Sequence, residues 1–239
     1  MATPSADENE VLSISLRRLI RDRKSGRTIF VRISQFLTWP FAFVFFHLVY
    51  RLRINGRENL EQISSPFILI ANHVSISGSF LFRLVLGFWT PHLPLRFMAV
   101  RRFNFRFLNF LADIGFVDFV YSLFGVFVVV PGRGLAKNLE EAKRIIKSRG
   151  NVVIYPEGDL EFKNIIAPFR PGASVLARET GAPVLPVSFR LGRRRHFRRK
   201  MTVNIGIPLQ VTPDMSIEKV TGIFYATIGE LYGENYKKG

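Results

Sequence analysis

The sequence contains no cysteine. Without cysteine the chain can form no disulfide bond, no thiolate nucleophile and no zinc site that depends on thiolate ligands. We therefore expect a reducing compartment, or one in which redox state has no influence, and a chemistry that is carried by other side chains.

Sequence patterns for metal and nucleotide binding are absent as well. The chain has four histidines, and they are scattered without the spacing that metal ligands require. Neither a Walker-type phosphate loop nor the glycine pattern of a dinucleotide-binding turn occurs. We expect no metal and no cofactor, and there is no internal repeat or low-complexity tract.

Acidic residues are scarce, since 18 Asp and Glu stand against 34 Lys and Arg, which gives a formal net charge of +16. The chain also has 24 phenylalanines, and 48% of its residues are hydrophobic. Basic charge together with abundant phenylalanine favours an anionic membrane surface as the partner. Nucleic-acid binding through the basic run at residues 193–200 would explain the charge but not the apolar N-terminal segment, so we expect no nucleic-acid partner.

The length of 239 residues suits one globular domain with an N-terminal extension. We expect a disordered polar tail at residues 1–10, membrane-associated helices at 11–51 and an α/β domain at 52–239. Leucines from Val11 onward recur at helical spacing among arginines, which predicts a basic amphipathic helix, with an ordinary surface helix as the alternative. Nothing in the sequence requires an oligomer.

Residues 36–50 form a strongly apolar segment with arginines on both sides. A bilayer core needs about 20 apolar residues, so this run is short for a span, and Pro40 disfavours a straight helix. We expect a helix or a broken helical hairpin that dips into one leaflet, with Trp39 and Tyr50 at the interface.

The remainder of the chain alternates between strand and helix patterns. The apolar runs 67–70 and 151–155 predict buried strands, and the helix expected at 135–148 precedes the second of them. This order is typical of a mostly parallel central sheet flanked by helices. Further strands are expected at 52–56, 97–100, 125–130, 184–189 and 201–207, and further helices at 79–88, 105–114, 172–180 and 216–233. Residues 190–200 are expected to form a basic hairpin loop that touches anionic lipid.

Three polar loops follow predicted strands and direct different chemistry to one cleft. Asn72-His73 offers a base, Pro131-Gly132-Arg133 a cation and Pro156-Glu157-Gly158 a carboxylate. Histidine is the most frequent general base in enzymes. His73 is therefore the candidate base, although a structural loop histidine is the alternative for this residue considered alone.

Six short motifs occur in the order typical of one family. They are Asn72-His73 with Ser75, residues 125–133, Val153-Ile154-Tyr155-Pro156-Glu157-Gly158, Phe169-Arg170-Pro171-Gly172-Ala173, Val184-Leu185-Pro186-Val187 and Ile205-Gly206-Ile207-Pro208. On these motifs the chain resembles the glycerolipid acyltransferase family, which includes bacterial 1-acylglycerol-3-phosphate acyltransferase. The resemblance implies an α/β fold on the cytoplasmic face of the inner membrane. It also implies acyl transfer from coenzyme A or acyl carrier protein to a hydroxyl of a lysophospholipid or related lipid.

The resemblance also implies roles for particular residues. His73 would take the proton of the acceptor hydroxyl, and Glu157 would organise the acceptor site. Arg133 is similar to an arginine that meets the acceptor phosphate, and turn amides near Gly158 would stabilise the oxyanion. The expected substrate-binding residues are Asn72, Arg133, Gly158 and Asp159.

Two positions depart from the family pattern. Gly78 stands where the family has an aspartate that orients the histidine, and Asp159-Leu160-Glu161 replaces a Thr-Arg-Ser sequence. Three explanations are open: another group orients the ring, or the chain is an inactive lipid-binding relative, or the acceptor lacks a phosphate at this position. The candidate groups are Asp113, Asp118, Asp159, Glu161, Ser77 and Ser79.

Overall fold

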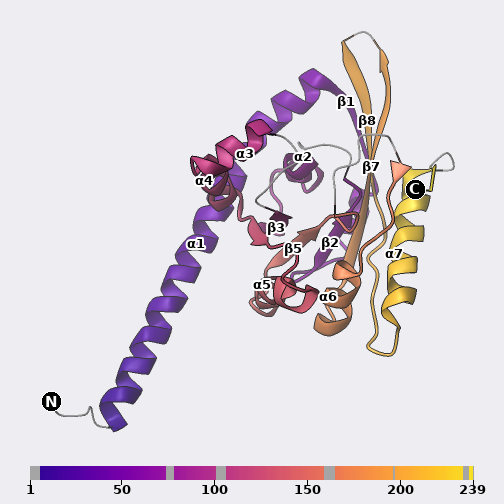
Figure 1. Ribbon diagram of the computed structural model, residues 1–239. Helices are drawn as coiled ribbons and strands as arrows, with labels where there is room; N and C mark the ends of the chain where they lie inside the picture. The colour runs from indigo at the N-terminus through magenta and orange to yellow at the C-terminus, as the bar shows by residue number, and fades with distance from the viewer. Residues whose placement is uncertain are drawn as a thin grey trace.

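A seven-stranded sheet forms the centre of the computed structural model, which describes residues 6–73, 78–100, 106–158, 165–195, 197–233 and 237–238 (Figure 1). Its strands have the order β1-β8-β7-β2-β5-β3-β4. They are β1 (Tyr50–Asn55), β2 (Ile68–Ala71), β3 (Leu95–Val100), β4 (Phe127–Val129), β5 (Asn151–Ile154), β7 (Val184–Arg195) and β8 (Arg198–Ile205). Neighbouring strands are parallel except β7 and β8, which are antiparallel. The expected mostly parallel sheet is confirmed.

Helices cover both faces of this sheet (Figure 1). The helices are α1 (Ala6–Val49), α2 (Gly78–Val85), α3 (Arg106–Asp113), α4 (Phe116–Phe124), α5 (Leu135–Lys147), α6 (Gly172–Thr180) and α7 (Ile217–Tyr232). A 3-10 turn, η1 (Arg57–Leu60), and a small pair of strands, β6 (Ile165–Ile166) and β9 (Lys237–Lys238), complete the described elements. The helices α1 and α2 contribute to one hydrophobic core, and α5, α6 and α7 contribute to the other.

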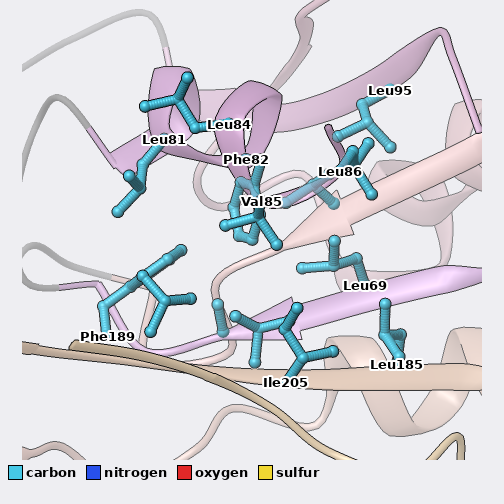
Figure 2. Close-up of a cluster of buried hydrophobic side chains, with 14 of the residues drawn as sticks. Leu69, Leu81, Phe82, Leu84, Val85, Leu86, Leu95, Leu185, Phe189 and Ile205 are labelled. Atoms are coloured by element: carbon cyan, nitrogen blue, oxygen red, sulfur yellow. The ribbon is translucent and has the colours of Figure 1, made fainter. Parts of the chain in front are cut away.

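The central strand β2 supplies side chains to both cores. Leu69 and Ala71 pack in the core under α2, as Figure 2 shows for Leu69, whereas Ile68 and Ile70 pack on the α5 and α6 side. All four side chains are fully buried. Burial of one such aliphatic side chain contributes roughly 1.5–3 kcal/mol. The end of β2 is therefore held firmly, and so is the residue that follows it.

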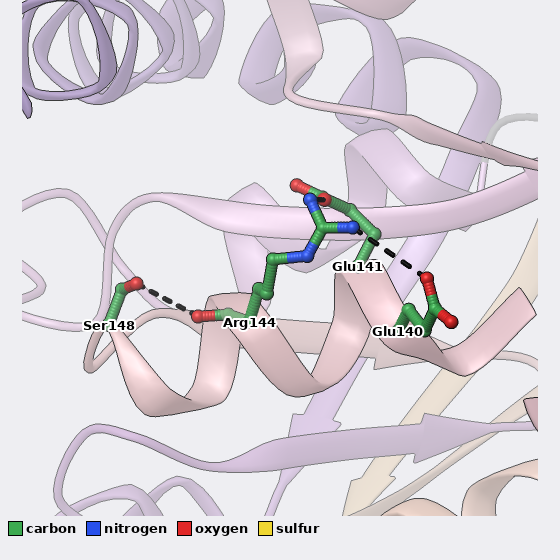
Figure 3. A network of polar contacts seen from close by, with 4 residues as sticks. All are labelled: Glu140, Glu141, Arg144 and Ser148. Atoms are coloured by element: carbon green, nitrogen blue, oxygen red, sulfur yellow. Dashed lines mark hydrogen bonds and ion pairs between the residues drawn. The ribbon is translucent and has the colours of Figure 1, made fainter. Parts of the chain in front are cut away.

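The helix expected at residues 135–148 is confirmed as α5. Its buried face consists of Leu139, Ala142, Ile145 and Ile146. Its outer face carries Arg144 between Glu140 and Glu141, with ion-pair distances of 3.8 and 2.9 Å (Figure 3). The helix ends where Ser148 donates to the Arg144 carbonyl and Arg149 adopts a positive φ of 61°.

The N-terminal segment is one continuous helix rather than a broken hairpin. Residues on both sides of Pro40 are buried against the domain, Val31 and Gln35 before it and Ala42 and Phe46 after it, so both halves keep one axis. The helix begins at Ala6, inside the stretch expected to be a disordered tail, and residues 1–5 lie outside the described part.

A buried glutamine fastens this helix to the domain. The Gln35 side chain donates to the carbonyls of Leu95 and Phe124 at 2.7 and 2.9 Å, and it accepts the Leu95 amide at 2.9 Å. The Gln35 carbonyl accepts from the buried Arg83 guanidinium at 2.9 Å. Burial lowers the pKa of Arg83 to about 10. The helix α1 is thus tied by polar contacts to β3, α4 and α2.

The outer side of α1 is apolar. Within the described part of the chain, Thr28–Val49 is one helix stretch of 22 residues that is long and apolar enough to cross a membrane, by length and composition alone. It is longer than the run of 15 residues taken from the sequence, because the helix continues without a break before residue 36. A core helix or a signal sequence can satisfy the same criterion, so this stretch is weak evidence for a span.

Candidate active site

Two loops meet at the carboxyl ends of β2 and β5. The two strands are parallel neighbours, with Ile68 opposite Val152 and Ile70 opposite Ile154. Their carboxyl ends therefore coincide, and the loops that follow them lie together. These loops carry His73 and Glu157, as the sequence predicted for two of the three polar loops.

A buried carboxylate holds the backbone of the candidate base. The His73 amide donates to Glu157 Oε2 at 2.6 Å, and the Ala167 amide donates to Oε1 at 3.1 Å. Glu157 is 4% exposed. Because both oxygens accept backbone N–H groups, this carboxylate positions the His73 loop and joins it to the segment before α6.

Asn72 extends the pairing between β2 and β7 by one residue. Its side chain is fully buried, donates to the Phe189 carbonyl at 2.9 Å and accepts the Phe189 amide at 2.7 Å. The side-chain amide thus takes the place of a backbone partner after Ala71, where the β2 ladder ends. We expected Asn72 to bind substrate. In this structure its side chain instead pairs with the backbone of Phe189 and fixes the start of the His73 loop.

The His73 ring lies against an aromatic side chain and has no described charged partner. Its centroid is 4.0 Å from that of Tyr155, at an interplanar angle of 31°. Its Nδ1 is buried and has no hydrogen-bond partner among the described residues. Burial lowers the pKa of His73 to about 4. The imidazole is therefore neutral at physiological pH, and its protonation is costly.

The proposed replacements for the family aspartate divide into two groups. Among the described residues, no hydrogen bond joins the ring to Asp113 or Asp118. Burial raises the pKa of Tyr121, and the charge of Asp118 raises it further, so Asp118 acts on that tyrosine. Ser77, Asp159 and Glu161 lie outside the described residues, as does the side chain of Ser79. Gly78 is the first residue of α2.

Gly158 has a left-handed backbone conformation and lies close to the side chain of Arg170, and both favour glycine at this position. Its φ is +80°, and a Cβ would lie 2.5 Å from Nε of Arg170. Its amide donates to the Tyr155 carbonyl at 3.1 Å. This N–H is engaged in the turn, and the role of turn amides near Gly158 in stabilising the oxyanion stays a prediction. The sequence did not single out Arg170, although it belongs to one of the six motifs.

Arg133 does not join His73 and Glu157 in the described part of the structure. It is exposed after β4, which is the edge strand, and β3 separates β4 from β5. Its amide donates to the Val130 carbonyl at 3.2 Å. From the sequence we expected this loop in the same cleft because it follows a predicted strand. In the sheet, however, β4 lies two strands away from β5, which precedes Glu157. Among the described residues, no three His, Asp or Glu side chains are grouped so that they could hold a metal ion.

Comparison with known proteins identifies the family. The family model described as Acyltransferase matches residues 51–190, so the chain belongs to the acyltransferase family. The resemblance seen in the sequence is confirmed.

Individual relatives carry more specific names. The chain is 23% identical to the chloroplastic 1-acyl-sn-glycerol-3-phosphate acyltransferase BAT2 of Brassica napus, over 66% of this chain and 42% of that protein. It is 26% identical to human 1-acyl-sn-glycerol-3-phosphate acyltransferase beta, over 60% of this chain and 49% of that protein. The matched region thus spans less than half the length of either relative.

A solved structure shows the same fold. It is the 1-acyl-sn-glycerophosphate acyltransferase PlsC from Thermotoga maritima, with a TM-score of 0.60 and 22% sequence identity. The match covers 94% of this chain and 87% of that chain, so it includes most of the N-terminal helix as well as the sheet.

Proposed function

We propose that this protein is a membrane-associated lipid acyltransferase that uses His73 as its general base. The observation that carries the proposal is the position of His73, which Glu157 holds at the carboxyl end of β2 with Nδ1 buried. The acyl group would pass from acyl-CoA or acyl carrier protein to a hydroxyl of a lysophospholipid or a related lipid. Membership of the acyltransferase family supports this reaction class.

The reaction divides into two proton transfers at one ring. His73 removes the proton of the acceptor hydroxyl as the alcohol oxygen attacks the thioester carbonyl, and the imidazolium gives this proton to the departing thiolate, which leaves as the thiol. Because Nδ1 is buried, Nε2 is the nitrogen that we place against the acceptor. Binding donor and acceptor side by side removes much of the entropic barrier.

The apolar surface supports a membrane location for this chemistry. Large side chains are exposed on α1 and also on the neighbouring α3 and α4. They include Ile29, Phe30, Ile33, Leu37 and Phe41 on α1, and Phe107, Phe110, Phe116 and Phe119 on α3 and α4. The chain has a net charge of +16, which favours an anionic lipid surface. We therefore propose that these helices enter an anionic leaflet on the cytoplasmic face of the inner membrane.

An inactive lipid-binding relative is the second candidate, favoured by one observation. The ring of His73 has no described carboxylate partner, and Gly78 stands where the family pattern has one. In a histidine-aspartate pair of another enzyme class, loss of the carboxylate function lowers kcat by about 10⁴.

Acyl transfer by the purified full-length protein distinguishes the two. The donors would be acyl-CoA and acylated acyl carrier protein, and the acceptors would be a panel of lysolipids with and without phosphate. His73→Ala should lower transfer by at least about 100-fold. His47→Ala, at an exposed position of α1, is the matched control and should retain activity. Absence of transfer with every pair would refute the enzyme and leave the lipid-binding candidate.

A further inference from the structure

A cationic cavity lies along the distal part of the β7–β8 hairpin, the ribbon that projects beyond the sheet in Figure 1. It has a volume of about 720 Å³ and is lined by Arg190, Arg193, Arg194 and Arg199. No carboxylate is among the described residues that line it. We call it the arginine pocket.

The strands of the hairpin continue through the run that was expected to be a loop. Pairing shifts by one residue between Leu191 and Arg194, where β7 carries a bulge. A bulge redirects the side chains that follow it. As a result Arg193 and Arg194 are exposed and line the same cavity as Arg199 of the opposite strand.

Backbone carbonyls and an aromatic ring hold two of the four arginines. Arg199 Nε donates to the Gly192 carbonyl at 2.9 Å, and Arg190 donates to the Tyr232 carbonyl at 3.4 Å. The Arg190 guanidinium also lies 5.7 Å from the centroid of the Tyr232 ring. Among the described residues, no ion pair involves these four arginines. Four like charges therefore converge where a bound anion would stabilise them.

The pocket lies on the same strand, β7, that contacts the start of the His73 loop. Phe189, which pairs with the Asn72 side chain, is the residue before Arg190. The buried Tyr232 has a raised pKa, mainly because of burial; Arg190 and Arg199 oppose this shift and Glu157 adds to it.

We propose that the arginine pocket binds a phosphorylated nucleotide, with its phosphates on the arginines and its base on the exposed Phe197 ring. Arginine suits phosphate through paired N–H donors, and aromatic rings suit any base by stacking. A cavity of this volume falls in the range of small-molecule and cofactor sites. If the proposed function holds, the occupant is the nucleotide end of a coenzyme A thioester, whose flexible arm carries the acyl group to His73.

Calorimetric titration of the full-length protein in detergent with adenosine 3′,5′-bisphosphate tests this site. Arg193→Gln with Arg194→Gln should raise the dissociation constant about 10- to 100-fold. Arg144→Gln with Lys147→Gln removes two charges from the exposed face of α5 and should leave it unchanged. Phe197→Leu should weaken bisphosphate at least about fivefold and leave inorganic pyrophosphate unaffected, because pyrophosphate has no base to stack.

Glycerol 3-phosphate separates a nucleotide from the other source of phosphate, a lipid headgroup. Equal affinity for glycerol 3-phosphate and bisphosphate, with the same dependence on the arginines, would overturn the nucleotide proposal. So would failure of the bisphosphate to bind, or binding that the arginine variant does not weaken. The bisphosphate has no acyl group, so His73→Ala should bind it normally. Absence of acyl transfer by the wild-type protein, with its binding of the bisphosphate intact, would refute the proposed function alone.

Discussion

Replacing Gly78 by aspartate should strengthen His73 as a base. Gly78 is the first residue of α2 and follows the His73 loop, so a side chain there begins in the first turn of a helix, where a carboxylate is favoured. In the present chain Nδ1 of His73 is buried without a described partner. A carboxylate at residue 78 would accept a hydrogen bond from Nδ1–H and stabilise the imidazolium that forms during the reaction.

The pKa of His73 sets the size of the expected gain. Burial holds this pKa at about 4, against an ordinary value of 6.5. A carboxylate within about 4–6 Å raises the pKa of a partner by about 1–3 units, each worth about 1.4 kcal/mol. Because the proton is only partly transferred in the transition state, part of this free energy lowers the barrier. We therefore expect kcat to rise about 10- to 100-fold.

The assay is the pH dependence of kcat/KM for acyl transfer, with Gly78→Ala as control. The alanine variant adds helix propensity without a carboxylate. The wild-type acid limb should lie near pH 4, whereas Gly78→Asp should move it upward toward neutrality together with the higher rate. If Gly78→Asp folds but has the rate and the acid limb of Gly78→Ala, the assignment of His73 as a base that lacks a carboxylate is refuted.

Three further predictions concern stability. Gly158→Ala should cost roughly 1–2 kcal/mol more than Gly132→Ala in urea unfolding, since both have positive φ but only Gly158 has Arg170 within 2.5 Å of the Cβ position; equal costs would contradict this. Because the pKa of His73 is lowered in the folded protein, the unfolded state takes up the proton first as pH falls. The free energy of unfolding of the wild type should therefore decrease by up to about 3 kcal/mol relative to that of His73→Ala between pH 6.5 and pH 4; parallel plots of unfolding free energy against pH would contradict this. Gln35→Leu should lower the unfolding free energy by about 1–3 kcal/mol through the unsatisfied Leu95 amide, and faster proteolysis of α1 is the readout; unchanged cleavage would contradict it.

The sequence predicted the elements whose pattern is local. Strand β2 is a short apolar run, and α5 has one buried stripe and a defined stop, so burial alone determines both. The adjacency of His73 and Glu157 also followed, because parallel central strands share a carboxyl edge. Sheet order is not local, and for this reason Arg133 was expected in the cleft but lies beyond β3.

Tertiary contacts decided the features that the sequence did not predict. Pro40 indicated a break, but buried residues on either side hold α1 in one piece. The basic run at 190–200 indicated a loop, whereas cross-strand pairing from Leu191–Met201 to Arg195–Arg198 continues the hairpin through it. In both places the local preference is weak compared with packing or pairing that the chain makes with distant residues.

The carboxylate of Glu157 contacts the backbone of His73 and not its ring. Glu157 fixes the loop through the His73 amide, and Tyr155 fixes the plane of the ring, so the position of the base does not depend on a carboxylate at residue 78. What such a carboxylate would add is a negative charge, which would oppose the effect of burial that lowers the pKa of His73 to about 4. The position of the histidine and the charge beside its ring are therefore separate properties of this site, and the described residues supply only the first. It follows that Gly78 can lower the rate without disordering the histidine, and Gly78→Asp should raise activity without any change in the fold.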